Sequence, residues 1–289
     1  MKHTKKYYPD GSFYVTVEEF SDSFTFFLNS YEDLWELNQI LDVYKYTNEN
    51  KPLVTIPCLL DAQADRRFEY NQPHGLKLVL NFLNSMYANF QFFHPHNSEV
   101  VEVALDNVNI IDNTEFIKNV LWNINGNYPK ENHYLNLKKD NLILMSSDAG
   151  GFKPLMKLCD KIGWQGETFS ASKSRKYVDG KSKLIQDIDR ADFEAKDILI
   201  IDDICVKGGT FIGLAKMLRE RNVGKLYLAV SHLTLETVSE DLIKSFDKIY
   251  TTDSKGFKEY KVLNSSNSGH DRAYSLVAEN VKVIKMFGN

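Results

Sequence analysis

The stretch Ile198–Phe211 constrains the fold of this chain more than any other feature of its sequence. Four aliphatic residues, ending at Ile201, predict a strand buried in a parallel sheet. Two adjacent carboxylates, Asp202 and Asp203, follow at the carboxyl end of that strand. Gly-Gly-Thr comes next, and the amphipathic run over 211–221 predicts a helix. The sequence therefore predicts a strand, a tight loop and a helix, which are the units of an α/β protein.

The loop between this strand and this helix has the composition of a binding site for a sugar phosphate. The first turn of a helix presents backbone N–H groups and a positive partial charge, both of which favour phosphate. Gly208 and Gly209 would let the backbone approach a ligand closely, and Thr210 would add a hydroxyl donor. The two carboxylates can take the hydroxyls of a sugar, or a metal ion. Lys207 either adds a charge to the phosphate or points into solvent.

The composition of the whole chain narrows the class of protein. Its 289 residues suffice for two domains of ordinary size, and 43% of them are hydrophobic, so substantial cores can form. The net charge of -4 gives no basic excess for nucleic acid. Cys58, Cys159 and Cys205 lack metal-site spacing, which predicts reduced thiols in a cytoplasmic protein. We expect neither a signal peptide nor a span of the roughly 18–20 apolar residues that a bilayer requires, and hence no membrane partner.

Both halves of the chain alternate between strand-like and helix-like segments. A capping-box pattern at Ser30–Asp33 and a proline at Pro73 each predict the start of a helix, and a further helix is expected over 153–162. The predicted strands beside the first one are 13–17, 24–28, 53–57, 90–93, 141–145, 166–171, 225–232 and 281–286. Between the halves, the polar segment 126–139 is the candidate linker. We therefore expect two α/β domains, 1–135 and 136–289, with mainly parallel sheets flanked by helices.

In the second half, several motifs carry a resemblance to a known family. The segment Asp202–Thr210 resembles the ribose-phosphate loop of type I phosphoribosyltransferases. Four further segments narrow the resemblance to the ribose-phosphate diphosphokinases, also called phosphoribosyl pyrophosphate synthetases. They are Ser147–Gly151, similar to the family's D-A-G-G strand end; Lys173–Arg175, similar to its K-x-R in a flexible loop; Val230–His232, similar to its V-T-H; and Thr251–Ser254, similar to its T-x-T-x.

The first half continues the resemblance in the same order along the chain. The segment Ile56–Arg67 resembles the family's I-P-Y-x-x-Y-x-R-Q-D-R region, and Gln72–Val79 is similar to the P-I-S-x-K-L-V helix that follows it. Tyr8–Gly11 resembles an early F-x-x-G-E. The matching order covers nearly the whole chain.

The resemblance implies a fold, a reaction and a set of partners. The fold would be two phosphoribosyltransferase-like domains. The enzyme would transfer the diphosphoryl group of ATP to the C1 hydroxyl of ribose 5-phosphate, giving phosphoribosyl diphosphate and AMP, with Mg²⁺ as cofactor. The N-terminal domain would contribute to the ATP site and to a homo-oligomer, a dimer or a hexamer. The C-terminal domain would bind ribose 5-phosphate.

The resemblance also implies roles for individual residues. Lys173 and Arg175 would be catalytic, closing over the transferred phosphoryl groups, and Asp148 would be a metal ligand. The expected ribose 5-phosphate site consists of Asp202, Asp203, Lys207, Gly208, Gly209 and Thr210. The expected ATP-binding residues are Gln63, Asp65, Arg66 and His96, of which His96 would also bind the metal.

The chain departs from the family pattern at several of these positions. Gln63 and Ala64 stand where the family carries Arg-Gln, and Val206 and Lys207 stand where it usually carries Asp-Thr. Two other functions therefore stay open. One is a phosphoribosyltransferase that consumes phosphoribosyl diphosphate. The other is a non-catalytic regulatory relative of the synthetase.

Overall fold

The computed structural model describes the backbone of residues 1–67, 69–125, 141–178, 181–263 and 276–287. Within these ranges it describes all side chains except those of 173–178, 181–186, 263 and 276. The predicted linker, 126–139, lies outside the described residues. None of the helices in the described ranges is both long and apolar enough to cross a membrane.

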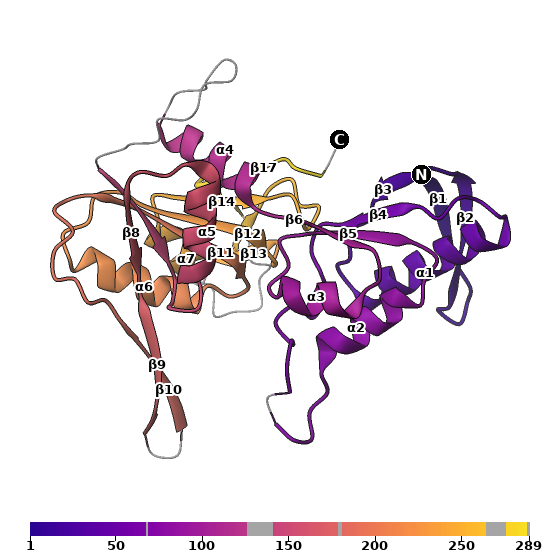
Figure 1. The fold of residues 1–289 in the computed structure, drawn as a ribbon, viewed down its shortest axis with the longest axis horizontal. Coiled ribbons are helices and arrows are strands. Elements are labelled where there is room, and N and C mark those ends of the chain that lie inside the picture. Colours follow the sequence, from indigo (N-terminus) through magenta and orange to yellow (C-terminus); the bar gives the residue numbers. More distant parts are fainter. Residues whose placement is uncertain (68, 126–140, 179–180, 264–275, 288–289) are drawn as a thin grey trace. The chain divides into compact units, whose positions relative to one another are not determined.

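The chain forms two compact units (Figure 1). Unit 1 contains Met1–Asp112 together with the short segment Ser254–Gly256, and unit 2 contains Asn113–Asp253 and Phe257–Gly288. The division thus falls between residues 112 and 113, earlier than the predicted boundary after residue 135. The reason is that helix α4, Thr114–Asn125, packs against elements of unit 2.

Unit 1 is built on a parallel sheet whose strands follow the order of the chain, β3-β4-β5-β6. Its helices carry apolar residues at helical spacing, and these residues cover the sheet to form one core. The predicted strand 24–28 ends at Thr25, and the predicted helix at Pro73 begins two residues later. The elements are β3 (Ser23–Thr25), α1 (Tyr31–Tyr46), β4 (Leu53–Ile56), α2 (Gly75–Asn84), β5 (Asn89–Phe93), α3 (Ser98–Ala104) and β6 (Val108–Ile111).

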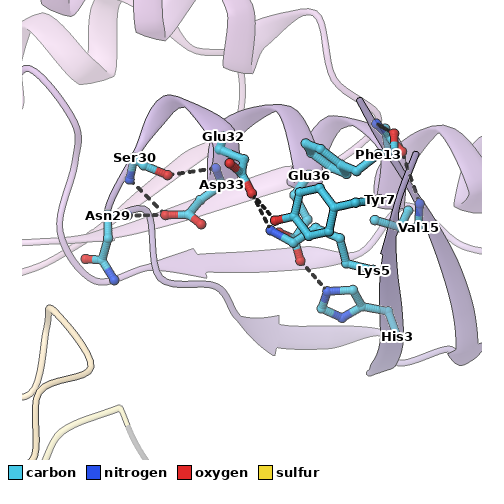
Figure 2. A network of polar contacts seen from close by, with 11 residues as sticks. His3, Lys5, Tyr7, Phe13, Val15, Asn29, Ser30, Glu32, Asp33 and Glu36 are labelled. Carbon is cyan, nitrogen blue, oxygen red and sulfur yellow. Dashed lines mark hydrogen bonds and ion pairs between the residues drawn. The ribbon is translucent and has the colours of Figure 1, made fainter. Parts of the chain in front are cut away.

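An antiparallel hairpin of β1 (Lys2–Tyr7) and β2 (Phe13–Glu19) precedes this sheet. Polar contacts join β1 to α1, as Figure 2 shows. Lys5 Nζ lies 2.6 Å from Glu36 Oε2 and 2.9 Å from Glu32 Oε1, and His3 Nε2 lies 2.6 Å from Glu36 Oε1. Burial lowers the pKa of Lys5, but its hydrogen bonds to the two glutamates outweigh burial and raise this pKa above its ordinary value. The buried Glu36 carboxylate is thereby paired with two basic side chains.

The segment Ser254–Gly256 belongs to unit 1 although it is distant in sequence. Lys255 is buried, and its Nζ donates a hydrogen bond to the carbonyl oxygen of Leu28 at 3.3 Å. Asn29 Nδ2 in turn donates to the carbonyl oxygen of Lys255 at 3.3 Å. The chain between β3 and α1 is therefore held by hydrogen bonds to Lys255, which lies more than 220 residues later in the sequence.

Unit 2 is built on a six-stranded sheet in the order β17-β14-β12-β11-β7-β8, in which all neighbouring strands are parallel. The chain enters at β7, moves outward to β8, then crosses back to β11 and continues to the opposite edge. The strand order therefore reverses between β7 and β11. The strands are β7 (Leu142–Ser146), β8 (Glu167–Ser170), β11 (Asp197–Cys205), β12 (Leu226–Leu233), β14 (Lys248–Thr252) and β17 (Val281–Ile284).

Helices and smaller strands complete unit 2. The basic segment after residue 172, predicted as a loop, forms a two-stranded antiparallel hairpin of β9 (Ser172–Val178) and β10 (Lys181–Asp187). The helices after α4 are α5 (Phe152–Ile162), α6 (Gly209–Arg219) and α7 (Glu240–Ser245). A small separate sheet is made of β13 (Thr237–Ser239), β15 (Lys261–Leu263) and β16 (Leu276–Val277).

This architecture confirms the predicted fold class, an α/β protein with mainly parallel sheets flanked by helices. The fully apolar segments of β7 and β11 are buried in the centre of their sheet, as continuous aliphatic runs predict.

The start of α1 offers a test of the local sequence signal. Ser30 Oγ accepts a hydrogen bond from the Asp33 N–H at 3.1 Å, and Asp33 Oδ2 accepts one from the Ser30 N–H at 2.8 Å. We expect Ser30→Ala to lower the free energy of unfolding by about 1 kcal/mol, and Ser30→Gly to lower it by only a few tenths of that amount. Urea denaturation measures both. An unchanged free energy of unfolding in Ser30→Ala would show that the cap does not stabilise the helix.

Candidate active site

At the reversal of strand order in unit 2, the neighbouring strands β7 and β11 end at different points along the carboxyl edge of the sheet. β11 pairs with β7 only up to Ile201, opposite Ser146, but it continues alongside β12 as far as Cys205. Asp202 and Asp203, predicted at the carboxyl end of this strand, lie within its last four residues, beyond the end of β7. In open α/β sheets, ligands bind at such a switch point, outside the carboxyl ends of the strands.

The Asp202 carboxyl is held on both of its oxygens. Oδ1 accepts a hydrogen bond from the Asp203 N–H at 2.8 Å, and Oδ2 accepts one from the Ser147 hydroxyl. Burial, followed by the neighbouring Asp203 carboxylate, raises the pKa of Asp202 to about 7, although the two hydrogen bonds act in the opposite direction. Ionisation of both carboxyls is therefore unfavourable, and a bound cation or hydroxyl donor would stabilise the ionised form.

The loop after these carboxyls leads directly into α6. The helix begins at Gly209, two residues before the predicted start, so Gly209 and Thr210 form its first turn, and Gly208 is the residue that precedes it. The first helical hydrogen bond runs from the Ile212 N–H to the carbonyl oxygen of Gly208 at 2.9 Å. The N–H groups of the first turn therefore have no partner within the helix. Lys207, at the start of the turn, is exposed.

The two glycines of this loop differ in whether the fold requires glycine at their positions. Gly208 has φ 78°, a left-handed conformation, and a Cβ there would lie 2.8 Å from Leu242 Cδ1. The fold itself thus requires glycine at 208. A Cβ on Gly209 would meet no atom within 4 Å, and its φ is not positive. The fold gives no reason for glycine at 209, whereas a ligand lying against the backbone would give one.

The second predicted phosphate or metal segment, at the end of β7, forms a turn into α5. Asp148 Oδ1 accepts a hydrogen bond from the Gly151 N–H at 3.0 Å, and the Ser146 hydroxyl donates to the Asp148 carbonyl oxygen at 2.9 Å. The Asp148 side chain therefore has a structural role in this turn. Its role as a metal ligand stays a prediction.

Two other segments of the resemblance are built into the sheet. His232 and Thr252 are buried, and the Thr252 hydroxyl donates to the carbonyl oxygen of Ser231 at 2.7 Å. Asp253 Oδ1 accepts from the N–H of Met286 at 2.7 Å. These polar groups connect neighbouring strands of the sheet.

In unit 1, the predicted ATP-binding residues follow β4 and β5, at the carboxyl edge of that sheet. Asp65 Oδ2 accepts a hydrogen bond from Asn97 Nδ2 at 3.1 Å, and Asn97 also caps α3. This contact joins the loop after β4 to the strand end that carries His96. The side chains of Gln63, Arg66 and His96 are exposed.

The structure brings together only part of the predicted site. Asp202 and Asp203 lie beside the loop 207–210 in unit 2. The side chains of the predicted catalytic residues Lys173 and Arg175, on β9, lie outside the described residues. In the described part of the chain, no three side chains among His, Cys, Asp and Glu are grouped as a metal site.

The donors in the two units differ in their fit to Mg²⁺. Mg²⁺ prefers oxygen ligands, which the carboxyl pair at 202–203 of unit 2 offers. The imidazole of His96, the predicted metal ligand of unit 1, is better suited to other metals. The raised pKa of Asp202 is consistent with a site that gains stability when a cation binds. The sequence did not predict the bond from Ser147 to Asp202, because the relative register of β7 and β11 is not readable from either segment alone.

The raised pKa of Asp202 predicts how stability depends on pH. Because the folded-state pKa lies above the unfolded value, the contribution of Asp202 to wild-type stability should fall as pH rises from about 4 to about 7, when the unfolded chain loses this proton and the folded chain retains it. In Asp202→Asn, the amide oxygen can accept the Asp203 N–H and the amide nitrogen can donate to the Ser147 hydroxyl oxygen, so both contacts can persist without the charge. We expect this variant to match wild type near pH 4 and to exceed its free energy of unfolding near pH 8 by about 1–3 kcal/mol.

Urea denaturation across this pH range measures the difference. Asp192→Asn is a control of opposite sign, because the Glu194 N–H and Asn222 side chain lower the pKa of Asp192. That variant should lose stability above pH 4 and not below it. A gain for Asp202→Asn that is the same at pH 4 and pH 8 would exclude ionisation of Asp202 as its cause.

Comparisons with known proteins agree with this geometry. The model of the phosphoribosyl transferase domain family matches residues 113–264, starting at the first residue of unit 2. The ribose-phosphate pyrophosphokinase of Pyrococcus furiosus is 23% identical over 255 residues, which cover 86% of this chain and 84% of the relative. That of Listeria ivanovii is 23% identical over 275 residues, covering 91% and 80%.

A solved structure is similar over almost the whole chain. The phosphoribosylpyrophosphate synthetase from Mycobacterium smegmatis aligns with a TM-score of 0.68 at 15% identity, covering 98% of this chain and 86% of that one, which shows a shared fold. The predicted resemblance to ribose-phosphate diphosphokinases, a synonym of pyrophosphokinases, is thus confirmed. Since the family model spans more than half of its residues, the chain belongs to the phosphoribosyl transferase domain family.

Proposed function

We propose that this chain is a ribose-phosphate diphosphokinase, which transfers the diphosphoryl group of ATP to the C1 hydroxyl of ribose 5-phosphate. The single observation that carries the proposal is the carboxyl edge of unit 2, where the carboxyl pair at 202–203 directly precedes a glycine loop and a helix start. A sugar and its phosphate need these two kinds of group side by side. The relatives of this name extend over both units, which supports the synthetase over a protein that needs unit 2 alone.

The proposed ribose 5-phosphate site uses the loop and the carboxyls for separate tasks. The N–H groups of Gly209 and Thr210 and the Thr210 hydroxyl would donate to the 5-phosphate, and Lys207 would add a positive charge. Asp202 and Asp203 would accept hydrogen bonds from the ribose hydroxyls. Each carboxylate oxygen has two lone-pair directions, so the oxygens that already accept one protein donor can accept a second.

The proposed reaction depends on positioning and charge. The C1 oxygen attacks the β-phosphorus of ATP, the bond from that phosphorus to the bridging oxygen breaks, AMP departs with that oxygen, and the hydroxyl proton is released. Lys173 and Arg175 would stabilise the negative charge on the transferred oxygens, Arg175 through a planar fork and Lys173 as a point charge. Mg²⁺, when bound, would screen the phosphates and reduce their repulsion of the nucleophile.

Unit 1 would contribute to ATP binding. Gln63, Asp65, Arg66 and His96 are the proposed contacts, and Asp65 and the segment of His96 are already joined through Asn97. His96 and Asp148 are the proposed metal ligands, as the resemblance to the ribose-phosphate diphosphokinases implies. The carboxyl pair of unit 2 fits Mg²⁺ in donor type as well.

We also propose a homo-oligomer, a dimer or a hexamer, that assembles through unit 1. Large apolar side chains are exposed on its helices, namely Tyr31 and Trp35 on α1 and Leu78 on α2, and Trp35 stacks on Phe82. The proposed location is the cytoplasm, where both substrates occur. All three cysteines lie in the described part of the chain, are buried and form no disulfide, which is consistent with a reducing compartment.

The proposal is tested by incubating the purified protein with ATP, Mg²⁺ and ribose 5-phosphate and measuring AMP. We expect AMP in equal amount to phosphoribosyl diphosphate. Lys173→Ala should lower kcat by about 10²–10³, by analogy with the loss of one donor to a developing negative charge, while ribose 5-phosphate binding by calorimetry stays near wild type. Lys176→Ala removes the same charge from the same strand, outside the proposed site, and is the matched control.

The two alternatives give different results in the same assay. A phosphoribosyltransferase would release diphosphate from phosphoribosyl diphosphate when a nucleobase is added, and would form no AMP from ATP. A regulatory relative, which the departures at 63–64 and 206–207 would favour, would bind ribose 5-phosphate without any AMP. Equal losses of binding and turnover in Lys173→Ala would contradict the catalytic assignment.

The glycine at 209 provides an independent test of the phosphate position. In Gly209→Ala the new Cβ meets open space in the protein, so we expect the free energy of unfolding to stay the same or to rise. We expect ribose 5-phosphate affinity to fall at least tenfold, because the Cβ would occupy the approach of the phosphate. Gly208→Ala is the contrasting variant, which should destabilise the fold itself through its φ and its contact with Leu242. Calorimetry and urea denaturation separate the two effects, and unchanged affinity in Gly209→Ala would remove the phosphate from this helix start.

A further inference from the structure

The contact between Ser147 and Asp202 lies at the one place where the central strands of unit 2 separate. The parallel register of β7 and β11 pairs Met145 with Ile200 and Ser146 with Ile201. The next pair in this register is Ser147 and Asp202. β7 has ended at that point, and the hydrogen bond from the Ser147 hydroxyl to Asp202 Oδ2 continues the connection between the strands through side chains.

This hydrogen bond fixes the direction of a carboxyl that has few other constraints. Oδ1 of Asp202 is held by the N–H of the next residue, a local contact that moves with the strand. Oδ2 is held by Ser147, which comes from a different strand. This second contact ties the carboxyl to the other side of the switch point. The donor itself is shielded from water, since Ser147 is 5% exposed.

The Ser147 hydroxyl favours ionisation of Asp202 and so opposes the effects of burial and of the Asp203 carboxyl, which raise the pKa of Asp202. A buried carboxylate requires donors to offset its lost hydration, and a hydrogen bond to a charged group contributes more than one between neutral groups. The Asp203 carboxyl opposes ionisation, whereas the hydroxyl of Ser147 favours it. Without Ser147, Asp202 would lose one of its two donors and its fixed orientation together.

We infer that Ser147 is a positioning residue of the sugar site: its hydroxyl holds the Asp202 carboxyl in the orientation that receives the ribose hydroxyls. This inference rests on the proposed function, because it assigns a role within the ribose 5-phosphate site. Ser147 does not touch the substrate. It acts through Asp202 alone, and this restriction separates it from a residue that merely supports the sheet edge.

A double-mutant cycle tests the restriction. The variants are Ser147→Ala, Asp202→Ala, which removes the carboxyl that Ser147 contacts, and the double variant, each with ribose 5-phosphate affinity measured by calorimetry and with KM and kcat measured from AMP formation. In the wild-type background, Ser147→Ala should weaken ribose 5-phosphate binding about tenfold and raise the KM for this substrate to a similar extent. kcat at saturating substrate and the KM for ATP should change less than about twofold. In the Asp202→Ala background, Ser147→Ala should add no further loss.

A control variant separates this role from general damage to the sheet edge. Ser170→Ala removes a hydroxyl at the end of the neighbouring strand β8, where it contacts Ser146 and the Asp148 carbonyl oxygen but not Asp202. It should leave ribose 5-phosphate affinity near the wild-type value.

The outcomes distinguish the inference from the proposed function. Equal losses for Ser147→Ala in both backgrounds, or full affinity in the wild-type background, would overturn the inference while AMP formation by the wild-type protein keeps the proposed function. A wild-type protein that neither binds ribose 5-phosphate nor forms AMP would overturn both.

Discussion

The divergence of β7 and β11 after Ser146 and Ile201 governs the carboxyl edge of unit 2. A parallel sheet satisfies its backbone through neighbouring strands, and where one neighbour leaves, polar side chains take its place. Asp202 does so by accepting the N–H of Asp203 and the hydroxyl of Ser147. Ser147 and Asp202, the polar residues that directly follow the last paired residues of β7 and β11, are thus available where a ligand would bind.

The same edge combines a stable sheet with unfavourable local groups. Before the divergence, all residues of β7 and β11 except Ser146 and Asp197 are apolar, and alternate residues of the two strands are buried in one core. That core supports a carboxyl whose ionisation is opposed by burial and by its neighbour. It also supports a glycine at 208 in the left-handed region. Enzymes commonly have binding sites with locally unfavourable groups, and the stability of the surrounding core offsets their free-energy cost.

Local signals predicted the elements of unit 2, but not the relations between them. The aliphatic run ending at Ile201 predicted a buried strand, and the capping pattern at Ser30 predicted the start of α1. The start of α6 was placed two residues too late because glycine and threonine are weak helix formers, although the first turn tolerates them. β1 was missed because lysines replace the usual apolar alternation. The contact of Ser147 with Asp202 depends on a register between segments far apart in the chain, which no local pattern contains.

The position of Lys255 in unit 1 limits how the protein can be dissected. A recombinant fragment that stops at Asp112 would omit this lysine, and the carbonyl oxygen of Leu28 would lose its ammonium donor. Conversely, a fragment that starts at Asn113 would carry the lysine without its acceptor. The halves are therefore interleaved along the polypeptide, and a single cut cannot separate them cleanly. Isolating unit 1 intact would require supplying the tripeptide Ser254–Gly256 as a tether or in trans.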